Sequence, residues 1–276
     1  MNLKDRVRDY WDNNICGVQE HSPRNPQQSK PVSDSTPYTR KYFEDIESRR
    51  YFINPEIFGF TQFTRYHGKK VLEVGVGPGT DFVQWCKAGA EACGVDLTPK
   101  GIEHAQRWLD EYQLKGKLSI MDAEYLEFPD DTFDLVYSWG VLHHTPDTQR
   151  AIQECIRVCK LGGEIKLMLY NRKSLTALGI WLSSLIHDRR FRTLSGALAN
   201  NMESPGTKAF TKNEVVKMLK PLPVEVIEIK AGTNKYDLLY QFPLPVRVAA
   251  YIFNWLTGFN SGFFMTIWLR KYYKRG

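Results

Sequence analysis

The chain has 276 residues, of which 37 are Lys or Arg and 31 are Asp or Glu, so its formal net charge is +6. Hydrophobic residues make up 42% and charged residues 25%, which excludes a disordered or low-complexity chain because there is enough apolar surface to offset the entropy of ordering. The length fits one globular domain, or one domain with an appendage. The only dense basic cluster lies at residues 270–275, so no nucleic-acid-binding surface is indicated.

Residues 1–66 are predicted to form an N-terminal extension with cap helices. Residues 3–12, LKDRVRDYWD, have the pattern of a short amphipathic helix. The segment that follows, up to residue 40, is polar and contains several prolines. From Tyr42 to Phe60 the apolar and aromatic residues recur at helical spacing. We expect this extension to accompany the main domain and not to form a separate one.

From residue 67 onward, strand and helix patterns alternate. Strands are predicted at 71–77, 92–97, 118–123, 133–139 and 164–170. Helices are predicted after Thr80, at about 100–114 and at about 148–160. Strands joined by single helices pair in parallel through right-handed crossovers, so the fold class is α/β with a doubly wound sheet.

After residue 170 the pattern changes. Residues 171–210 contain an apolar helix-like piece, LTALGIWLSSLIH, then the basic DRRFR and a loose polar run. This stretch is longer than a simple connection requires, so we predict an inserted lid within a main domain that spans residues 67–276. A helix that begins with a capping box at Thr211, a strand at 224–229, an apolar helix at 244–257 and a last strand near 262–269 complete the pattern.

The segment VLEVGVGPGT, residues 71–80, joins the first predicted strand to a helix through a glycine-rich turn. Glycine suits a turn with unusual dihedral angles and a close approach of ligand to backbone. Two interpretations compete. A dinucleotide-binding fingerprint needs a third glycine at position 80, where this chain has Thr80. Glu73 and Asp81 beside the turn instead favour a ligand that carries positive charge.

Five motifs in order make this region resemble the class I S-adenosylmethionine-dependent methyltransferases, in particular the small-molecule branch with the ubiquinone and menaquinone C-methyltransferases. The resemblance covers about residues 70–170 and implies a Rossmann-like, mostly parallel seven-stranded sheet with an antiparallel last strand, and S-adenosylmethionine as cofactor. The motifs are EVGVGPGT at 73–80, GVDLTP at 94–99, MDAEYLEFPDDTFD at 121–134, SWGVLHHTPD at 138–147 and LGGEIKLMLY at 161–170.

The resemblance also implies the cofactor contacts. In that family the glycine loop contacts the methionine part, the acid after the second strand binds the ribose hydroxyls, and the acid after the third contacts the adenine amine; here those acids are Asp96 and Asp122. A carboxylate can indeed accept two vicinal hydroxyl protons, although either acid alone could cap a turn. The predicted cofactor contacts are Glu73, Gly75, Gly77, Gly79, Asp81, Asp96, Leu97, Asp122, Ala123, Ser138, Trp139 and His143.

The predicted reaction is in-line transfer of a methyl group to an O, N, S or C nucleophile of a small molecule. Such a reaction requires positioning and exclusion of water, and it needs a base only when the nucleophile starts protonated. We predict His144 as that base, Tyr170 as an orienting group and Arg172 as a clamp for a carboxylate. The alternatives are a structural role for His144, packing for Tyr170 and a solvated loop position for Arg172.

Aromatic residues of the extension are predicted to cover the sulfonium, whose charge favours an aromatic face, although core packing is the alternative. They are Tyr10, Trp11 and Tyr42. An alternative function is an enzyme that uses another carbon of the sulfonium, or a non-catalytic sensor of the same cofactor.

Partners are predicted to be limited to a small-molecule acceptor, with a monomer or homodimer as the oligomeric state and no metal. Ser138-Trp-Gly-Val-Leu stands where methyltransferases of adenine or of glutamine amides share a [D/N]-P-P-[Y/F] motif, which argues against nucleic acid. Five cysteines without a C-x-x-C pair, and no signal peptide at the start, predict a cytoplasmic location with Cys155 and Cys159 as buried apolar residues. Contact of the 244–257 helix with a lipid surface is a lesser alternative.

Overall fold

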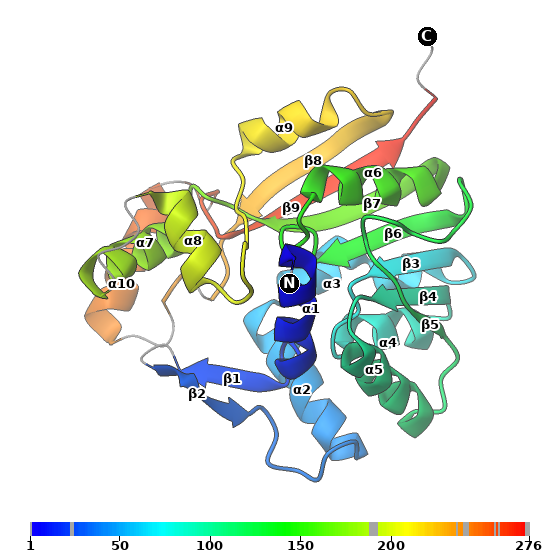
Figure 1. Ribbon diagram of the computed structural model, residues 1–276, viewed down its shortest axis with the longest axis horizontal. Helices are drawn as coiled ribbons and strands as arrows, with labels where there is room; N and C mark the ends of the chain where they lie inside the picture. The colour runs from blue at the N-terminus through cyan, green and yellow to red at the C-terminus, as the bar shows by residue number, and fades with distance from the viewer. Residues whose placement is uncertain are drawn as a thin grey trace.

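The computed structural model describes residues 2–22, 25–187, 193–235, 237–239, 243–256, 258 and 260–273. It confirms the doubly wound α/β fold, with seven strands in the order β5-β4-β3-β6-β7-β9-β8 (Figure 1). Neighbours from β5 to β7 pair in parallel, and β9 runs antiparallel to both β7 and β8, as predicted. The strands are β3 (Lys70–Val74), β4 (Glu91–Asp96), β5 (Lys117–Ile120), β6 (Phe133–Trp139), β7 (Cys159–Tyr170), β8 (Val224–Gly232) and β9 (Phe264–Lys271).

Helices cover both faces of this sheet. Figure 1 shows α4 (Thr80–Lys87) and α5 (Pro99–Glu111) on one face, and α6 (Thr148–Val158) and α9 (Lys212–Leu219) on the other. Successive residues of β3 alternate between the two hydrophobic cores, Val71 packing on one side and Leu72 on the other. The capping box at Thr211 forms as predicted, with its side chain accepting from the Glu214 N–H.

The N-terminal extension contains α1 (Leu3–Asn13), α2 (Arg40–Ile53), α3 (Glu56–Thr61) and the 3-10 helix η1 (Phe63–Tyr66). It also contains an antiparallel hairpin of β1 (Gln19–Ser22) and β2 (Asn25–Pro31), which the sequence did not predict. The sequence of this segment is polar and contains prolines, so it does not have the pattern of a strand. A hairpin can still form, because each strand of a two-stranded ribbon has a free edge where proline is tolerated. In Figure 1, α1 lies in front of the central strands of the sheet.

The region predicted as a lid insert contains two helices, α7 (Leu175–His187) and α8 (Leu194–Asn201). Helix α8 falls in the run that the sequence indicated was loose, and it begins with Thr193 as its N-cap. The basic DRRFR at 188–192 and the end of the basic tail at 274–276 lie outside the described residues. Helix α10 (Leu244–Leu256) lies beside α7 in Figure 1.

Two further sequence predictions concern the cysteines and the apolar helices. All five cysteines are free, and Cys155 and Cys159 are buried, as predicted for small apolar residues. Within the part of the chain that the structure describes, no helix combines the length and the apolar character needed to cross a bilayer.

Candidate cofactor and acceptor site

The glycine-rich turn between β3 and α4 has three glycines in the left-handed region. The φ angles of Gly75, Gly77 and Gly79 are 81°, 51° and 90°. A Cβ on Gly75 would lie 2.2 Å from a Val141 methyl carbon, and one on Gly79 would lie 2.8 Å from the Ala105 Cβ. A Cβ on Gly77 would meet no atom within 4 Å. Two of the glycines therefore permit close packing within the protein, whereas Gly77 borders open space.

Asp96, at the carboxyl end of β4, holds this turn in place. Its Oδ2 accepts the Gly77 N–H at 2.8 Å, and its Oδ1 accepts the N–H and the hydroxyl of Thr98 at 2.9 and 2.7 Å. Burial raises the pKa of Asp96, while the Thr98 and Gly77 hydrogen bonds act in the opposite direction. The side chain remains partly exposed, so its carboxylate is accessible from the side of the open space.

Asp122 follows β5 and meets α1. Lys4 Nζ lies 2.5 Å from Asp122 Oδ2 and 2.7 Å from Glu124 Oε2. Burial lowers the pKa of Lys4, but the bonds to the two carboxylates more than offset this effect and raise it overall. The Asp12 carboxylate accepts the Lys100 N–H at 3.1 Å. Helix α1 is thus attached to the residues that follow β4 and β5.

Asp81, in the first turn of α4, is the centre of a buried hydrogen-bond cluster. It accepts from Arg50 Nη2 at 2.5 Å, from the Tyr51 hydroxyl at 3.1 Å and from the Tyr137 hydroxyl at 2.8 Å. Burial, followed by the Asp81 charge, raises the pKa of Tyr137 well above its ordinary value, so this hydroxyl stays a donor. Arg50 is a residue that the sequence analysis missed, because nothing in the α2 text distinguishes it from the neighbouring Arg49.

Glu73 lies in the core and not on the open space. It is 3% exposed and accepts the Trp85 Nε1–H at 2.9 Å. Burial and then the nearby Asp81 charge raise the pKa of Glu73 well above its ordinary value. The structure therefore gives Glu73 the surroundings of a neutral carboxyl that supports β3, and it does not bring Glu73 to the ligand side of the turn.

The carboxyl end of β6 also borders this region. Ser138 donates to the Val74 carbonyl at 2.8 Å, which ties β6 to β3. The Trp139 ring lies 5.9 Å from the Arg50 guanidinium carbon. Leu97 is partly buried and Ala123 is buried beside the ends of β4 and β5.

His144 faces Glu203, which lies just after α8 and which the sequence analysis missed. His144 Nδ1 lies 2.8 Å from Ser204 Oγ and 3.0 Å from Thr207 Oγ1. His144 Nε2 lies 3.7 Å from Glu203 Oε2, and the Tyr170 hydroxyl donates to the same oxygen at 3.0 Å. Histidine, tyrosine and carboxylate thus converge from the loop after β6, from β7 and from the predicted lid. Glu203 belongs to no recognisable motif, so the sequence carried no signal for it.

Both histidines are neutral in these surroundings. Burial, followed by the Lys208 charge, lowers the pKa of His144 to about 3. Burial and then His144 lower the pKa of His143 well below its ordinary value. His143 packs on Tyr170, with ring centroids 3.8 Å apart.

Two aromatic residues of α1 reach this group. The Trp11 ring lies 5.1 Å from the His144 ring and 5.1 Å from Tyr10. Burial and the Glu203 charge raise the pKa of Tyr10 to about 12. Tyr10 and Trp11 therefore lie beside the group formed by His144 and Glu203, and their predicted role in covering the sulfonium stays a prediction.

The structure does not bring Tyr42 and Arg172 to this group. The Tyr42 hydroxyl lies 3.0 Å from His104 Nε2, and His104 Nδ1 lies 2.7 Å from the Pro78 carbonyl, so Tyr42 supports the glycine turn from behind. Arg172 forms an ion pair with Glu214 at the start of α9. Their predicted substrate and catalytic roles have no geometric support, because core packing and an ion pair occupy both side chains.

Several buried polar atoms of the candidate site have no partner within the protein. In the described part of the chain, Thr80 Oγ1, Trp139 Nε1 and both ring nitrogens of His143 are buried without a hydrogen-bond partner. Thr80 directly follows Gly79 of the turn. Buried polar atoms in folded proteins normally have a partner, so these atoms are candidates for contact with a bound polar ligand.

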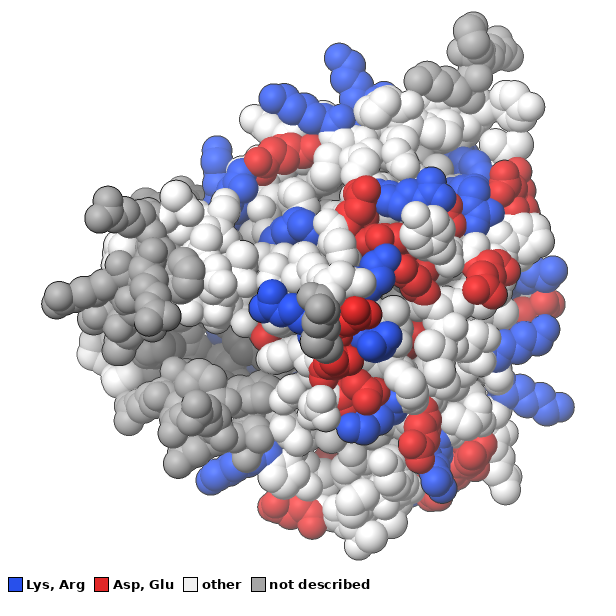
Figure 2. Space-filling view, viewed as in Figure 1, with Lys and Arg blue, Asp and Glu red and all other residues white. Residues whose placement is uncertain are grey.

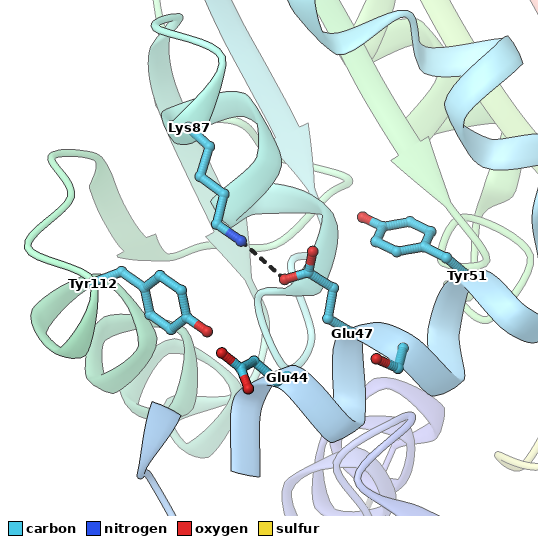
Figure 3. A pocket seen from close by; sticks show the side chains of 6 residues that line it. Glu44, Glu47, Tyr51, Lys87 and Tyr112 are labelled. Carbon is cyan, nitrogen blue, oxygen red and sulfur yellow. Dashed lines mark hydrogen bonds and ion pairs between the residues drawn. The ribbon is translucent and has the colours of Figure 1, made fainter. Parts of the chain in front are cut away.

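A separate shallow pocket of about 360 Å³ lies between α2, α4 and α5 (Figure 3). Lys87 from α4 donates to Glu47 from α2 at 2.9 Å at its edge, and the Lys87 ammonium lies 4.8 Å from the Tyr112 ring centroid. Tyr51 is the only lining residue that also belongs to the Asp81 cluster. The pocket is lined by none of the glycines or carboxylates of the candidate site, and the charges at its edge are paired with each other.

Comparison with known proteins identifies the class of this domain. Residues 71–163 match the family described as "Methyltransferase domain". The phosphatidylethanolamine N-methyltransferase of Cereibacter sphaeroides is 35% identical over 103 residues, which are 37% of this chain and 50% of that protein. The ubiquinone biosynthesis O-methyltransferase of Coxiella burnetii is 34% identical over 105 residues, 38% of this chain and 45% of that protein. The chain thus matches about half the length of these curated relatives.

A solved structure extends the similarity of fold to nearly the whole chain. The geranyl diphosphate C-methyltransferase of Streptomyces coelicolor, in complex with S-adenosyl-L-homocysteine, aligns over 98% of each chain with a TM-score of 0.66 at 13% identity. Residues 71–163 therefore contain a methyltransferase domain, and its fold is shared with a methyltransferase that binds S-adenosyl-L-homocysteine, in agreement with the motifs.

Proposed function

We propose that this protein transfers the methyl group of S-adenosylmethionine to an O, N, S or C nucleophile of a small molecule. The observation that carries the proposal is the turn at Gly77, which borders open space and is tied through its N–H to Asp96 at the end of β4. In open α/β sheets, ligands bind at the carboxyl ends of strands where the strand order reverses, and β3 lies at that point between β4 and β6.

The residues around the turn match the groups of the cofactor. Asp96 has acceptor oxygens for the ribose hydroxyls, and Asp122 has an acceptor for the adenine amine. Arg50 and Asp81 offer one cation and one carboxylate for the amino-acid end, which carries both charges. When bound, the sulfonium supplies an electrophilic methyl group.

On the acceptor side, His144 has the protonation state of a base. The Thr207 hydroxyl donates to the Ser204 carbonyl at 2.7 Å, which leaves its oxygen to accept from His144 Nδ1–H. The proposal uses this neutral tautomer, in which the lone pair is on Nε2, 3.7 Å from Glu203 Oε2. A hydroxyl or amine of the acceptor can lose its proton to Nε2, while Trp11 and α1 exclude water.

The three relatives named above act on nitrogen, oxygen and carbon, respectively, by their names. The domain is therefore compatible with several nucleophiles, and the acceptor is decided by residues outside the shared 71–163 region, such as Glu203 and the aromatic residues of α1. Mass spectrometry of products formed from cell-extract fractions and S-adenosylmethionine labelled in its methyl group tests for methyl transfer. Release of methylthioadenosine without a methylated product would instead indicate use of another carbon of the sulfonium.

Asp96→Ala tests the cofactor site. We expect it to weaken binding of S-adenosylmethionine and S-adenosylhomocysteine at least about 100-fold by calorimetry, since hydrogen bonds to a charged acceptor contribute about 1.5–3 kcal/mol each. Asp96→Asn keeps the size of the side chain, and Asp110→Asn, on the exposed end of α5, is the matched control. Wild-type affinity in Asp96→Ala would contradict the site assignment.

A further inference from the structure

Helix α10 presents large apolar side chains to solvent along most of its length. Leu244, Trp255 and Leu256 are 67%, 64% and 70% exposed, and Val246, Val248, Tyr251, Ile252 and Phe253 are also exposed. Two of its residues, Ala250 and Asn254, are buried. Soluble proteins seldom expose so much contiguous apolar surface unless it binds something.

The side of α10 that faces the protein is held by polar bonds. Asn254 is fully buried; its Oδ1 accepts from the Thr233 hydroxyl at 3.0 Å and its Nδ2 donates to the Asp237 carbonyl at 3.2 Å. The Asp237 carboxylate in turn accepts from the Thr176 hydroxyl of α7 at 2.9 Å. The usual amphipathic arrangement is therefore inverted, with the polar residue inside and the apolar residues outside.

The exposed apolar arc is too wide for a flat protein partner. At 3.6 residues per turn, the exposed positions from Leu244 to Leu256 cover roughly 220° of the helix circumference, on both sides of Trp255. A second copy or another folded protein covers mainly one side of a surface helix. Acyl chains surround an embedded helix on three sides and can therefore cover the whole apolar arc.

The chemistry of α10 also fits a lipid surface. Its one charged residue is the exposed Arg247, which lies at the border between the buried stripe and the apolar arc, and the helix contains no acid. Tyr and Trp, present here as Tyr251 and Trp255, favour the boundary between headgroups and acyl chains. Helix α7, which is linked to α10 through Asp237, also has two exposed leucines, Leu178 and Leu182, which are four residues apart and share a face of that helix.

We propose that α10 docks at the headgroup–acyl boundary of a lipid bilayer. Helix α10 has 13 residues and a length of about 20 Å, shorter than a bilayer core of about 30 Å, so it lies in the surface and does not span it. Arg247 contacts lipid phosphates at the edge of the inserted face.

This surface adjoins the proposed acceptor site. The Asp237 carboxylate that is linked to α10 also accepts the Phe263 N–H at 2.9 Å, and the Phe263 ring stacks on Tyr170 with centroids 4.3 Å apart. A docked protein therefore has its acceptor site close to the lipid surface. This consequence rests on the proposed function, whereas docking itself does not and is measured without turnover.

Co-sedimentation of the full chain with vesicles tests the proposal. We expect wild-type protein to bind vesicles of mixed phosphatidylcholine and phosphatidylglycerol, and to bind pure phosphatidylcholine vesicles more weakly because of Arg247. The double variant Ile252→Glu, Trp255→Glu should bind at least about tenfold more weakly, since two charges then face the acyl boundary. Val216→Glu, an exposed apolar residue on α9, is the matched control and should bind as wild type does.

The variants remain interpretable because both substituted side chains are exposed, and Trp255→Gln gives a milder version of the same change. Circular dichroism and thermal unfolding establish that each variant is folded. Absence of wild-type binding to either vesicle, or equal binding by the double variant, overturns the proposal. A wild-type dimer in sedimentation velocity that Ile252→Glu, Trp255→Glu converts to monomer, with no vesicle binding, would assign the face to a second copy of the chain.

Discussion

Gly77 offers a sharp test of where the cofactor binds, because its two possible roles give different results in an alanine variant. Its φ of 51° is left-handed, and placing an L-residue there costs about 1–2 kcal/mol of folding free energy. No atom lies within 4 Å of the added Cβ, so the protein itself imposes no clash. Gly162, at the exposed start of β7, has a φ of 76° and the same empty surroundings, so Gly162→Ala is a matched control for backbone strain.

We expect both variants to lose about 1–2 kcal/mol of unfolding free energy, which lowers the melting temperature by about 2–4 °C per kcal/mol. They should differ in ligand binding. At a hundredfold excess over its Kd, S-adenosylhomocysteine stabilises a binding-competent protein by about 2.7 kcal/mol. Gly162→Ala should keep that thermal shift, and Gly77→Ala should lose about half of it or more, which corresponds to at least about tenfold weaker binding by calorimetry. Equal binding by the two variants would refute the assignment of the open space at Gly77 to the cofactor.

Three further substitutions test other parts of the structure. His144→Gln should lower kcat and leave S-adenosylhomocysteine binding unchanged. Because burial keeps the pKa of His144 at about 3, the rate of the wild-type protein plotted against pH should show no histidine titration near pH 6.5. A titration there that the variant removes would contradict a neutral His144. Burial lowers the pKa of Lys166 from 10.5 to about 8, so at this site the unfolded chain binds more protons between those values, and the contribution of Lys166 to stability rises with pH across that window. Lys166→Met removes this contribution, so in denaturant titrations the variant should exceed wild type in stability most at pH 7, and this difference should shrink as the pH rises to 10.5. A difference that does not change with pH would contradict the lowered pKa of Lys166. Lys4→Met removes the ion pairs to Asp122 and Glu124 and should speed tryptic cleavage within α1, measured by mass spectrometry, whereas unchanged protection would show that other contacts hold the helix.

Most of the sheet could be predicted because buried parallel strands have continuous apolar sequences. Strands β6 and β7 are buried along most of their length; β6 has its predicted bounds, whereas β7 ends as predicted at Tyr170 but begins at Cys159, five residues before the predicted start. Strand β5 is an exposed edge strand and ends at Ile120, before the predicted residue 123. The β1–β2 hairpin and α8 could not be predicted, because polar composition hides their periodicity.

The residues of the candidate site likewise divide into those that the sequence could predict and those that it could not. Gly77, Asp96 and Asp122 lie within local motifs, each at the end of a strand, so spacing along the chain was sufficient to find them. Arg50 and Glu203 come from distant helical segments and act only through tertiary contacts. The pairing of Lys4 with Asp122 joins residues 118 positions apart, and no local pattern specifies a contact of that kind.

Helix α1 connects the two halves of the proposed site and must therefore take part in ligand exchange. Lys4 pairs with the acid that is expected to meet the adenine, and Trp11 contacts the histidine that is expected to receive the acceptor proton. Figure 2 shows acidic and basic side chains interspersed on the face that α1 covers. The Lys4–Asp122 pair is 29% and 24% exposed at its two side chains, and partly solvated pairs of this kind contribute about 1 kcal/mol or less. The contacts of α1 can thus exclude water during transfer and still release at a low cost, so that cofactor and acceptor can be exchanged after each turnover.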